Sequence, residues 1–124
     1  MNFNESKPIY LQIADLICDK IVNCQWQQGD RILSVRDMGS ELEVNPNTVM
    51  RAYEWLAEKN IIYNKRGVGF FISADALASV RADRREQLLN NDLREIAKRM
   101  QQLDITVDEV ASYITDYLKG NFTR

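Results

Sequence analysis

The chain has 124 residues, 45% of them hydrophobic and 27% charged, with a net charge of −2, which fits one globular domain with a small extension rather than a protein held to nucleic acid by bulk charge. It contains no histidine and two cysteines, which excludes histidine-based catalysis and leaves a zinc site almost without ligands. The polar N-terminus (MNFNESKP) and the lack of any apolar run of membrane-spanning length favour a cytoplasmic protein, and we expect no metal, no cofactor, no membrane partner and no enzymatic activity.

A first helix is predicted from Pro8 to about Cys24 (PIYLQIADLICDKIVNC), because its apolar residues recur at helical spacing. We expect this helix to pack beneath the helices that follow. Cys18 and Cys24 lie on different sides of the predicted helix, so they can neither bridge each other nor share a metal ion. We interpret both cysteines as small apolar fillers.

The segment from Gln25 to Arg31 (QWQQGDR) is predicted to be a connector, with a turn at Gly29-Asp30. Its Trp26 is interpreted as a plug that closes the domain rather than as a ligand platform.

Two short helices joined by a tight turn are predicted within residues 34–56 (SVRDMGSELEVNPNTVMRAYEWL). Ser34 is followed three residues later by Asp37, which is the form of an N-terminal capping motif and starts the first helix. Pro46 suits the first position of the second helix, with Asn45 as its cap. This layout is that of a helix-turn-helix.

The second of these helices has an apolar face and a polar face. The face that we expect to be buried consists of Val49, Ala52, Tyr53 and Leu56. The exposed residues near its N-terminal end are Asn47, Thr48 and Arg51, whose amide, hydroxyl and guanidinium groups can bond base edges and phosphates in a major groove. Taken alone, the pattern fits ordinary solvated side chains about equally well.

A β-hairpin is predicted directly after this helix, in residues 61–73 (IIYNKRGVGFFIS). Lys65 and Arg66 stand at its tip, where Gly67 and Gly69 let the backbone approach a phosphate chain or a minor groove. A helix-turn-helix followed at once by a basic, glycine-tipped hairpin is far more specific than either part alone. We therefore predict a winged helix-turn-helix, in which the hairpin of residues 61–73 is the wing.

Residues 8–73 resemble the winged-helix DNA-binding domain of the GntR family of bacterial transcription regulators. The resemblance is carried by PIYLQIADLI, GDRILSVRDMGSELEVNPNTVMRAYEWL and KRGVGFF, in that order. The NPNTV run followed by Arg51-Ala52-Tyr53, together with the short C-terminal remainder, is most similar to the YtrA-type branch of the family.

The resemblance implies DNA contacts by Arg36, by Asn47, Thr48 and Arg51, and by the wing from Arg66 to Gly69. With the cap and the first basic residue of the wing, the candidate DNA-binding residues are Ser34, Arg36, Asn47, Thr48, Arg51, Lys65, Arg66, Gly67 and Gly69. The chain departs from the family pattern at Ile32-Leu33-Ser34, where Leu-Pro-Ser is usual, at Val68, where a basic residue is common, and at Phe70, where a small polar residue is common. Whether the wing enters the minor groove stays open.

The remainder of the chain is predicted to be a helical tail. Residues 76–103 form one long helix or two short ones, broken near Asn90-Asn91. A further helix starts at Thr106, which forms a capping box with Glu109, and stops at Gly120. We therefore divide the chain into a DNA-binding domain (1–74) and a helical dimerisation tail (75–124), which is too small to be an independent domain.

A helical hairpin that cannot bury its own apolar stripe needs a partner surface, and the simplest partner is a second copy in a two-fold dimer. The predicted dimerisation residues are Leu88, Leu89, Leu93, Ile96, Met100, Val110, Ile114 and Leu118. The alternative is that the hairpin folds back on the winged domain. The resemblance implies a dimer, because YtrA-type proteins look like dimers made through a short helical tail. An unknown small-molecule effector is left open, with the surface near Tyr113 and Tyr117 as its candidate site, although such tyrosines more often pack in a dimer.

The predicted fold is mostly α with a small β-hairpin, a winged helix-turn-helix domain followed by a C-terminal helical hairpin. The predicted function is a homodimeric, sequence-specific transcription regulator, a repressor, that binds double-stranded DNA at a roughly palindromic operator. The alternative is a winged-helix module that binds protein and not DNA, which the negative net charge favours.

Overall fold

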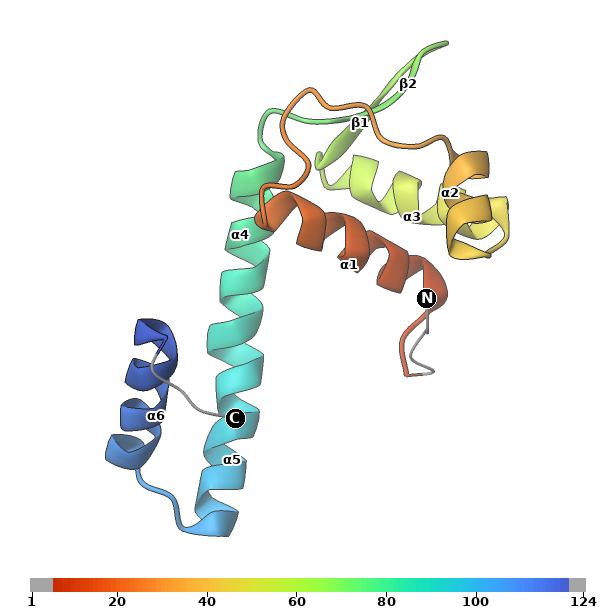
Figure 1. Ribbon diagram of the computed structural model, residues 1–124. Coiled ribbons are helices and arrows are strands. Elements are labelled where there is room, and N and C mark those ends of the chain that lie inside the picture. The colour runs from red at the N-terminus through yellow and green to blue at the C-terminus, as the bar shows by residue number, and fades with distance from the viewer. Residues whose placement is uncertain (1–5, 121–124) are drawn as a thin grey trace. The chain divides into compact units, whose positions relative to one another are not determined.

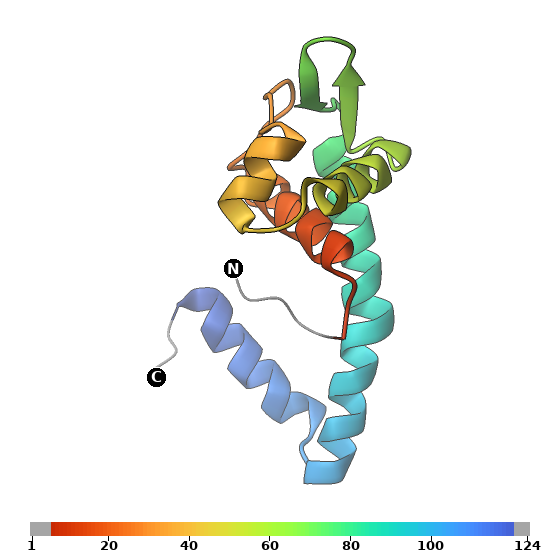
Figure 2. The ribbon, with the colours of Figure 1, turned by 90° about the vertical axis from the view of Figure 1, so that its right-hand side faces the viewer.

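The computed structural model describes residues 6–120, and the chain forms two compact units that divide between Asp83 and Arg84 (Figure 1). The first unit contains a helix-turn-helix and a hairpin. Its elements in chain order are α1 (Ile9–Val22), α2 (Val35–Leu42), α3 (Pro46–Glu58), β1 (Ile62–Lys65), β2 (Gly69–Ile72) and the beginning of α4 (Ala76–Gln87). Helices α1 and α2 both pack against α3, and the hairpin extends from the end of α3 (Figures 1 and 2). This arrangement confirms the predicted winged helix-turn-helix.

The core of the first unit draws apolar side chains from each of its elements. Its largest fully buried side chains are Ile13, Ile17 and Ile21 of α1, Val49, Tyr53 and Leu56 of α3, Ile62 and Ile72 of the hairpin, and Val80 of α4. The predicted buried face of α3 is confirmed, since its four residues have no exposed surface. Each buried side chain of this size contributes about 1.5–3 kcal/mol to stability, so the rotation of α3 about its axis is strongly determined.

Both helices of the helix-turn-helix begin at the predicted caps. The backbone amide of Asp37 donates to Ser34 Oγ at 3.1 Å, and the amide of Asn47 donates to Asn45 Oδ1 at 2.8 Å. Pro46 occupies the first turn of α3, where its missing N–H has no intrahelical partner to lose. Helix α2 ends at Leu42, and the left-handed backbone of the next residue, Glu43 (φ 58°), turns the chain toward α3.

The first helix ends earlier than predicted, at Val22. The carbonyl oxygen of Lys20 accepts from the amides of Gln25 and Trp26, which turns the chain, and Cys24 adopts a left-handed conformation (φ 61°). Cys24 is therefore exposed, whereas Cys18 is buried. The interpretation as an apolar filler is right for Cys18 and wrong for Cys24, because Cys24 lies beyond the helix.

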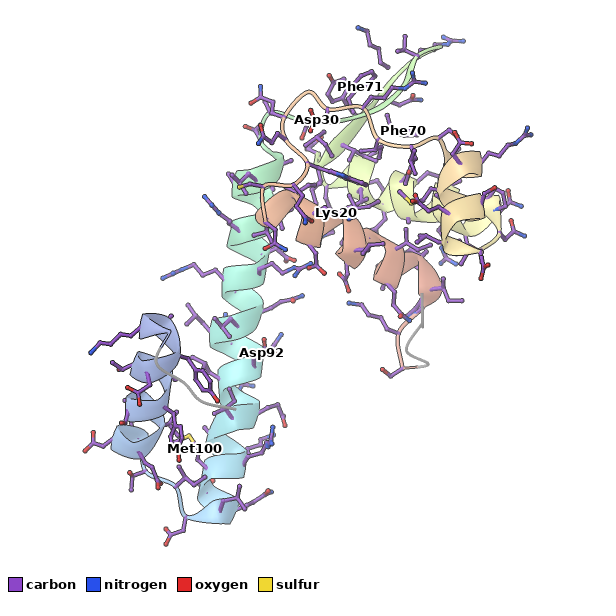
Figure 3. All side chains as sticks on the ribbon, viewed as in Figure 1. Lys20, Asp30, Phe70, Phe71, Asp92 and Met100 are labelled. Atoms are coloured by element: carbon purple, nitrogen blue, oxygen red, sulfur yellow. The ribbon has the colours of Figure 1, made fainter. Side chains whose placement is uncertain are left out.

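The connector before α2 also pairs with the strand β2 of the wing. Arg31 forms an antiparallel bridge with Phe71, and the amide of Ile72 donates to the carbonyl oxygen of Asp30 at 2.9 Å. Figure 3 shows Asp30 close to β2, the strand that carries Phe70 and Phe71. The connector thus lies beside β2 as a third, short extended segment. Trp26 is half-buried and packs against the core, with Lys20 Nζ 5.6 Å from its ring centroid.

The helix after the wing belongs at its start to the first unit. Ala76 and Val80 are 1% and 2% exposed within that core, so the compact unit extends to Asp83 and not to the predicted boundary at residue 74. The shift has a simple cause: the first two turns of α4 supply apolar surface that the winged domain buries.

The second unit contains the end of α4, a π-helical turn (Leu88–Asp92), α5 (Leu93–Leu103) and α6 (Val107–Lys119). The predicted break near Asn90-Asn91 is this π turn: the amide of Leu93 donates to the carbonyl oxygen of Leu88, five residues back, and the chain stays helical. Thr106 Oγ1 accepts from the amide of Glu109 at 3.2 Å and begins α6, as predicted, and α6 ends at Gly120. Within residues 6–120 no helix has the length and apolarity to cross a membrane.

Candidate nucleic-acid interface

The N-terminal half of α3 presents polar side chains to solvent. Asn47 and Arg51 are exposed and Thr48 is half-buried, opposite or beside the four buried residues of the same helix. Because the core fixes the rotation of α3, these three side chains have a defined direction. The amide and hydroxyl lie in the first turn of α3 and the guanidinium in the second, and such groups can bond base edges and phosphates in a major groove.

Tyr53 links this helix to the rest of the helix-turn-helix and to the wing. Its hydroxyl donates to the carbonyl oxygen of Leu33 at 2.7 Å, one residue before the cap of α2. Its ring meets Phe70 of β2 edge to face, with centroids 5.0 Å apart. Burial raises the pKa of the Tyr53 phenol above its usual value, so the hydroxyl stays protonated and can donate. Phe70, a departure from the family pattern, thus serves to hold the wing against α3.

Arg51 has a neighbour that the sequence reasoning missed. Its guanidinium carbon lies 4.2 Å from the ring centroid of Tyr10, near the start of α1. Tyr10 is half-buried and packs against the core. In the sequence, Tyr10 stands within the apolar pattern of the first helix, and nothing local indicates that its ring reaches a residue of α3.

Ser34 and Arg36 lie at the start of α2, and both are exposed. Ser34 Oγ accepts an amide hydrogen bond as the cap, which leaves its own O–H free to donate to a phosphate. Arg36 is the second residue of α2, so its positive charge lies at the N-terminal end of the helix. The helix dipole also favours a bound anion at this end.

The tip of the wing is exposed and basic. Lys65 is the last residue of β1 and Arg66 is the first residue of the turn, which the amide of Val68 closes by donating to the carbonyl oxygen of Lys65 at 2.8 Å. Gly67 adopts φ 79° with no atom within 4 Å of where a Cβ would stand. The turn therefore offers two cations and an unobstructed stretch of backbone, as the sequence predicts, while Val68 at 44% exposure adds an apolar side chain beside them.

Gly69 has a packing role that the sequence did not indicate. A Cβ at this position would stand 2.9 Å from Nε of Arg31, and the residue has φ 143°. The absence of a side chain allows the Arg31 guanidinium to lie against the base of the wing. Arg31 thereby becomes an exposed cation near the hairpin, and only the bridge between the connector and β2 brings it there.

The predicted dimerisation residues all lie in the second unit, and no residue in the described part of that unit is buried. Met100 of α5 and Val110 of α6 are half-buried, and with Ile96, Leu103 and Ile105 they line a cavity of about 260 Å³ (Met100 is labelled in Figure 3). The others remain exposed: Leu88 49%, Leu89 47%, Leu93 41%, Ile96 39%, Ile114 49% and Leu118 85%. Tyr113 and Tyr117, near the candidate effector surface, are also exposed. The dimer and effector assignments stay predictions.

A family model, curated relatives and solved structures all identify the same protein family. Residues 9–72 match the family model described as "Bacterial regulatory proteins, gntR family". The uncharacterized HTH-type transcriptional regulator YhcF of Bacillus subtilis is 36% identical over 118 residues, which are 95% of this chain and 96% of YhcF. The HTH-type transcriptional repressor YtrA of the same organism is 38% identical over 71 residues, which are 57% of this chain and 55% of YtrA.

Among solved structures, a GntR family transcriptional regulator from Listeria monocytogenes is similar with a TM-score of 0.78 and 37% identity. The similarity covers 92% of this chain and 98% of that one, so it includes most of the tail as well as the winged domain. The family model spans more than half of the chain, and its match coincides with the helix-turn-helix and the wing. The chain therefore belongs to the GntR family of bacterial DNA-binding transcriptional regulators.

Proposed function

We propose that the protein is a homodimeric repressor that binds a roughly palindromic operator and places two recognition helices, one α3 from each copy, in successive major grooves. The observation that carries the DNA-reading role is the fixed rotation of α3. Four fully buried residues on one face direct Asn47, Thr48 and Arg51 outward at the end of the helix that follows the tight turn.

The proposed dimer rests on the apolar side chains of the second unit. Leu93 and Ile96 on α5 and Ile114 on α6 are 39–49% exposed, although side chains of this kind are usually buried. An exposed apolar surface rimmed by charged residues is typical of a protein–protein interface. A second copy presents the same surface, so a two-fold axis pairs it with itself.

The repressor role is supported by similarity. YtrA, which carries the name of a transcriptional repressor, is 38% identical over a segment that covers 57% of this chain. A regulator that acts as a repressor needs only to occupy its operator, and the proposal assigns DNA binding to the first unit and dimerisation to the second.

The proposal is tested by selecting bound sequences from a random duplex pool with the purified full chain, together with light scattering to measure its mass. We expect a two-fold symmetric site, with half-sites separated by about one helical turn or a multiple of it, ~34 Å each, and a dimer mass. A monomer mass would refute the dimer. A well-folded dimer that enriches no sequence would refute specific recognition by α3.

The residue-level test is Arg51→Ala. If its guanidinium forms a bidentate contact with a base, the variant should lose about 1–3 kcal/mol of binding to the selected site and much less on random DNA. Equal losses on both duplexes would show that Arg51 holds only phosphate.

The competing function is a winged-helix module that binds another protein, which the net charge of −2 favours. Gel shifts at low salt separate the two functions, because even non-specific DNA binding by the basic wing should be detectable there. Absence of any shift would favour the protein-binding module.

A further inference from the structure

We infer that Tyr10 is a positioning residue that orients Arg51 for base recognition. This inference rests on the proposed function, since it assigns a role to Arg51 in reading DNA. It starts from one contact between residues far apart in the chain: the guanidinium carbon of Arg51 lies 4.2 Å from the centroid of the Tyr10 ring.

The contact constrains the arginine without using its hydrogen-bond donors. A guanidinium that stacks on an aromatic ring presents its flat face to the ring, and its five N–H groups point outward in the plane. In that arrangement the edge of the Arg51 guanidinium is available for O6 and N7 of a guanine or for a phosphate. Among residues 6–120, no carboxylate forms an ion pair with Arg51 that would compete for that edge.

The Tyr10 ring is held in place by the first turn of α1 and by the core. Tyr10 lies in the first turn of α1, where the amides of Leu11 and Gln12 donate to the carbonyl oxygen of Pro8. The Gln12 side-chain amide donates to the carbonyl oxygen of Lys7 at 2.7 Å, and Lys7 pairs with Asp15. The ring is also half-buried against the core, so α1 holds it in one place while α3 supplies the arginine.

Pre-orientation affects binding through entropy. A free arginine side chain has many rotamers, and fixing them at the moment of DNA binding opposes binding. The contact with Tyr10 restricts those rotamers in the unbound protein. Tyr10 thus contributes to affinity and to base discrimination without touching a base.

The test is a double-mutant cycle on the duplex enriched by the random-pool selection. Tyr10→Leu should weaken binding about 2- to 30-fold, the range expected for loss of a cation–π contact. Tyr10→Phe, the matched control, keeps the ring and should stay within about 2-fold of the unchanged protein. In the Arg51→Ala background Tyr10→Leu should have no further effect, because the group that it positions is gone.

Base preference distinguishes a positioning role from a purely structural one, because a general loss of stability would not change the preference at a single position. Tyr10→Leu should relax base preference at the same position of the duplex as Arg51→Ala, and at no other. The Nε–H resonance of Arg51, shifted by the ring current of Tyr10 in the free protein, should move in Tyr10→Leu and remain in Tyr10→Phe. Thermal unfolding of each variant shows whether the fold is retained.

The outcomes separate this inference from the function on which it rests. If the unchanged protein enriches a duplex but the two substitutions act additively, or if the Arg51 Nε–H resonance is the same in Tyr10→Leu, the positioning role is overturned while specific DNA recognition stands. If the unchanged protein enriches no duplex, the proposed function and this inference both fail.

Discussion

Replacing Tyr53 by phenylalanine removes one oxygen atom from the junction of α2, α3 and the wing. The hydroxyl of Tyr53 donates to the carbonyl oxygen of Leu33 at 2.7 Å, and the side chain has no exposed surface. The phenylalanine ring keeps the volume and the edge-to-face contact with Phe70 at 5.0 Å. The substitution therefore isolates one hydrogen bond between the recognition helix and the entry to α2.

The expected loss is about 1 kcal/mol of unfolding free energy. A hydrogen bond of this kind contributes ~0.5–1.5 kcal/mol net, and a buried acceptor left without a partner costs ~1–3 kcal/mol. The Tyr53–Leu33 bond is only partly buried, which favours the lower end of these ranges. For a domain of this size the melting temperature should fall by roughly 4–8 °C per kcal/mol.

Urea unfolding followed by the fluorescence of Trp26 and Trp55, both half-buried in the first unit, measures this loss. The matched control is Tyr63→Phe, because Tyr63 is 45% exposed and keeps its stack on Phe71 when the hydroxyl is removed. Its effect should stay within about 0.5 kcal/mol. If Tyr53→Phe is as stable as the control, the hydroxyl contributes nothing to the junction.

The pH dependence of stability gives a second, independent readout. Burial raises the pKa of folded Tyr53 above the usual value near 10 that holds in the unfolded chain. Above pH 10 the unfolded state therefore binds fewer protons than the folded state, and unfolding free energy falls as pH rises, by up to ~1.4 kcal/mol per pH unit from this one group. The contribution is fully present below pH 10. Tyr53→Phe should lack this component; if both proteins lose stability in parallel above pH 10, the raised pKa is refuted.

Further substitutions test the cap, the wing and the tail. Asn45→Ala should cost about 1 kcal/mol of stability through loss of the α3 cap; an unchanged urea midpoint would contradict this role. Gly69→Ala should destabilise more than Gly67→Ala, because φ 143° lies farther than φ 79° from the left-handed region that L residues can adopt, and because the new Cβ would stand 2.9 Å from Nε of Arg31; equal losses would contradict this difference. Lys65→Ala should lower the slope of log affinity against log salt by about 1, and an unchanged slope would remove it from the phosphate contacts. Leu93→Asp should convert the proposed dimer to a monomer in light scattering, whereas a retained dimer mass would place the interface elsewhere.

The local features of this protein could be predicted from its sequence, because the interactions that produce them join residues a few positions apart. The caps at Ser34, Asn45 and Thr106 each bond an amide two or three residues later. The buried face of α3 follows from helical periodicity, and the glycines mark the hairpin turn. The same patterns identified the polar residues of α3 and the basic wing tip as the DNA-binding candidates.

What tertiary structure alone decided are the contacts between distant segments, since no local pattern encodes which surfaces meet. The start of α4 enters the winged core because that core has apolar surface to cover, which moved the unit boundary to Asp83. Arg31 reaches the wing only because the connector pairs with β2, and this pairing explains Gly69. Tyr10 and Arg51, on α1 and α3, meet because those two helices pack through their apolar faces, which places their flanking side chains together.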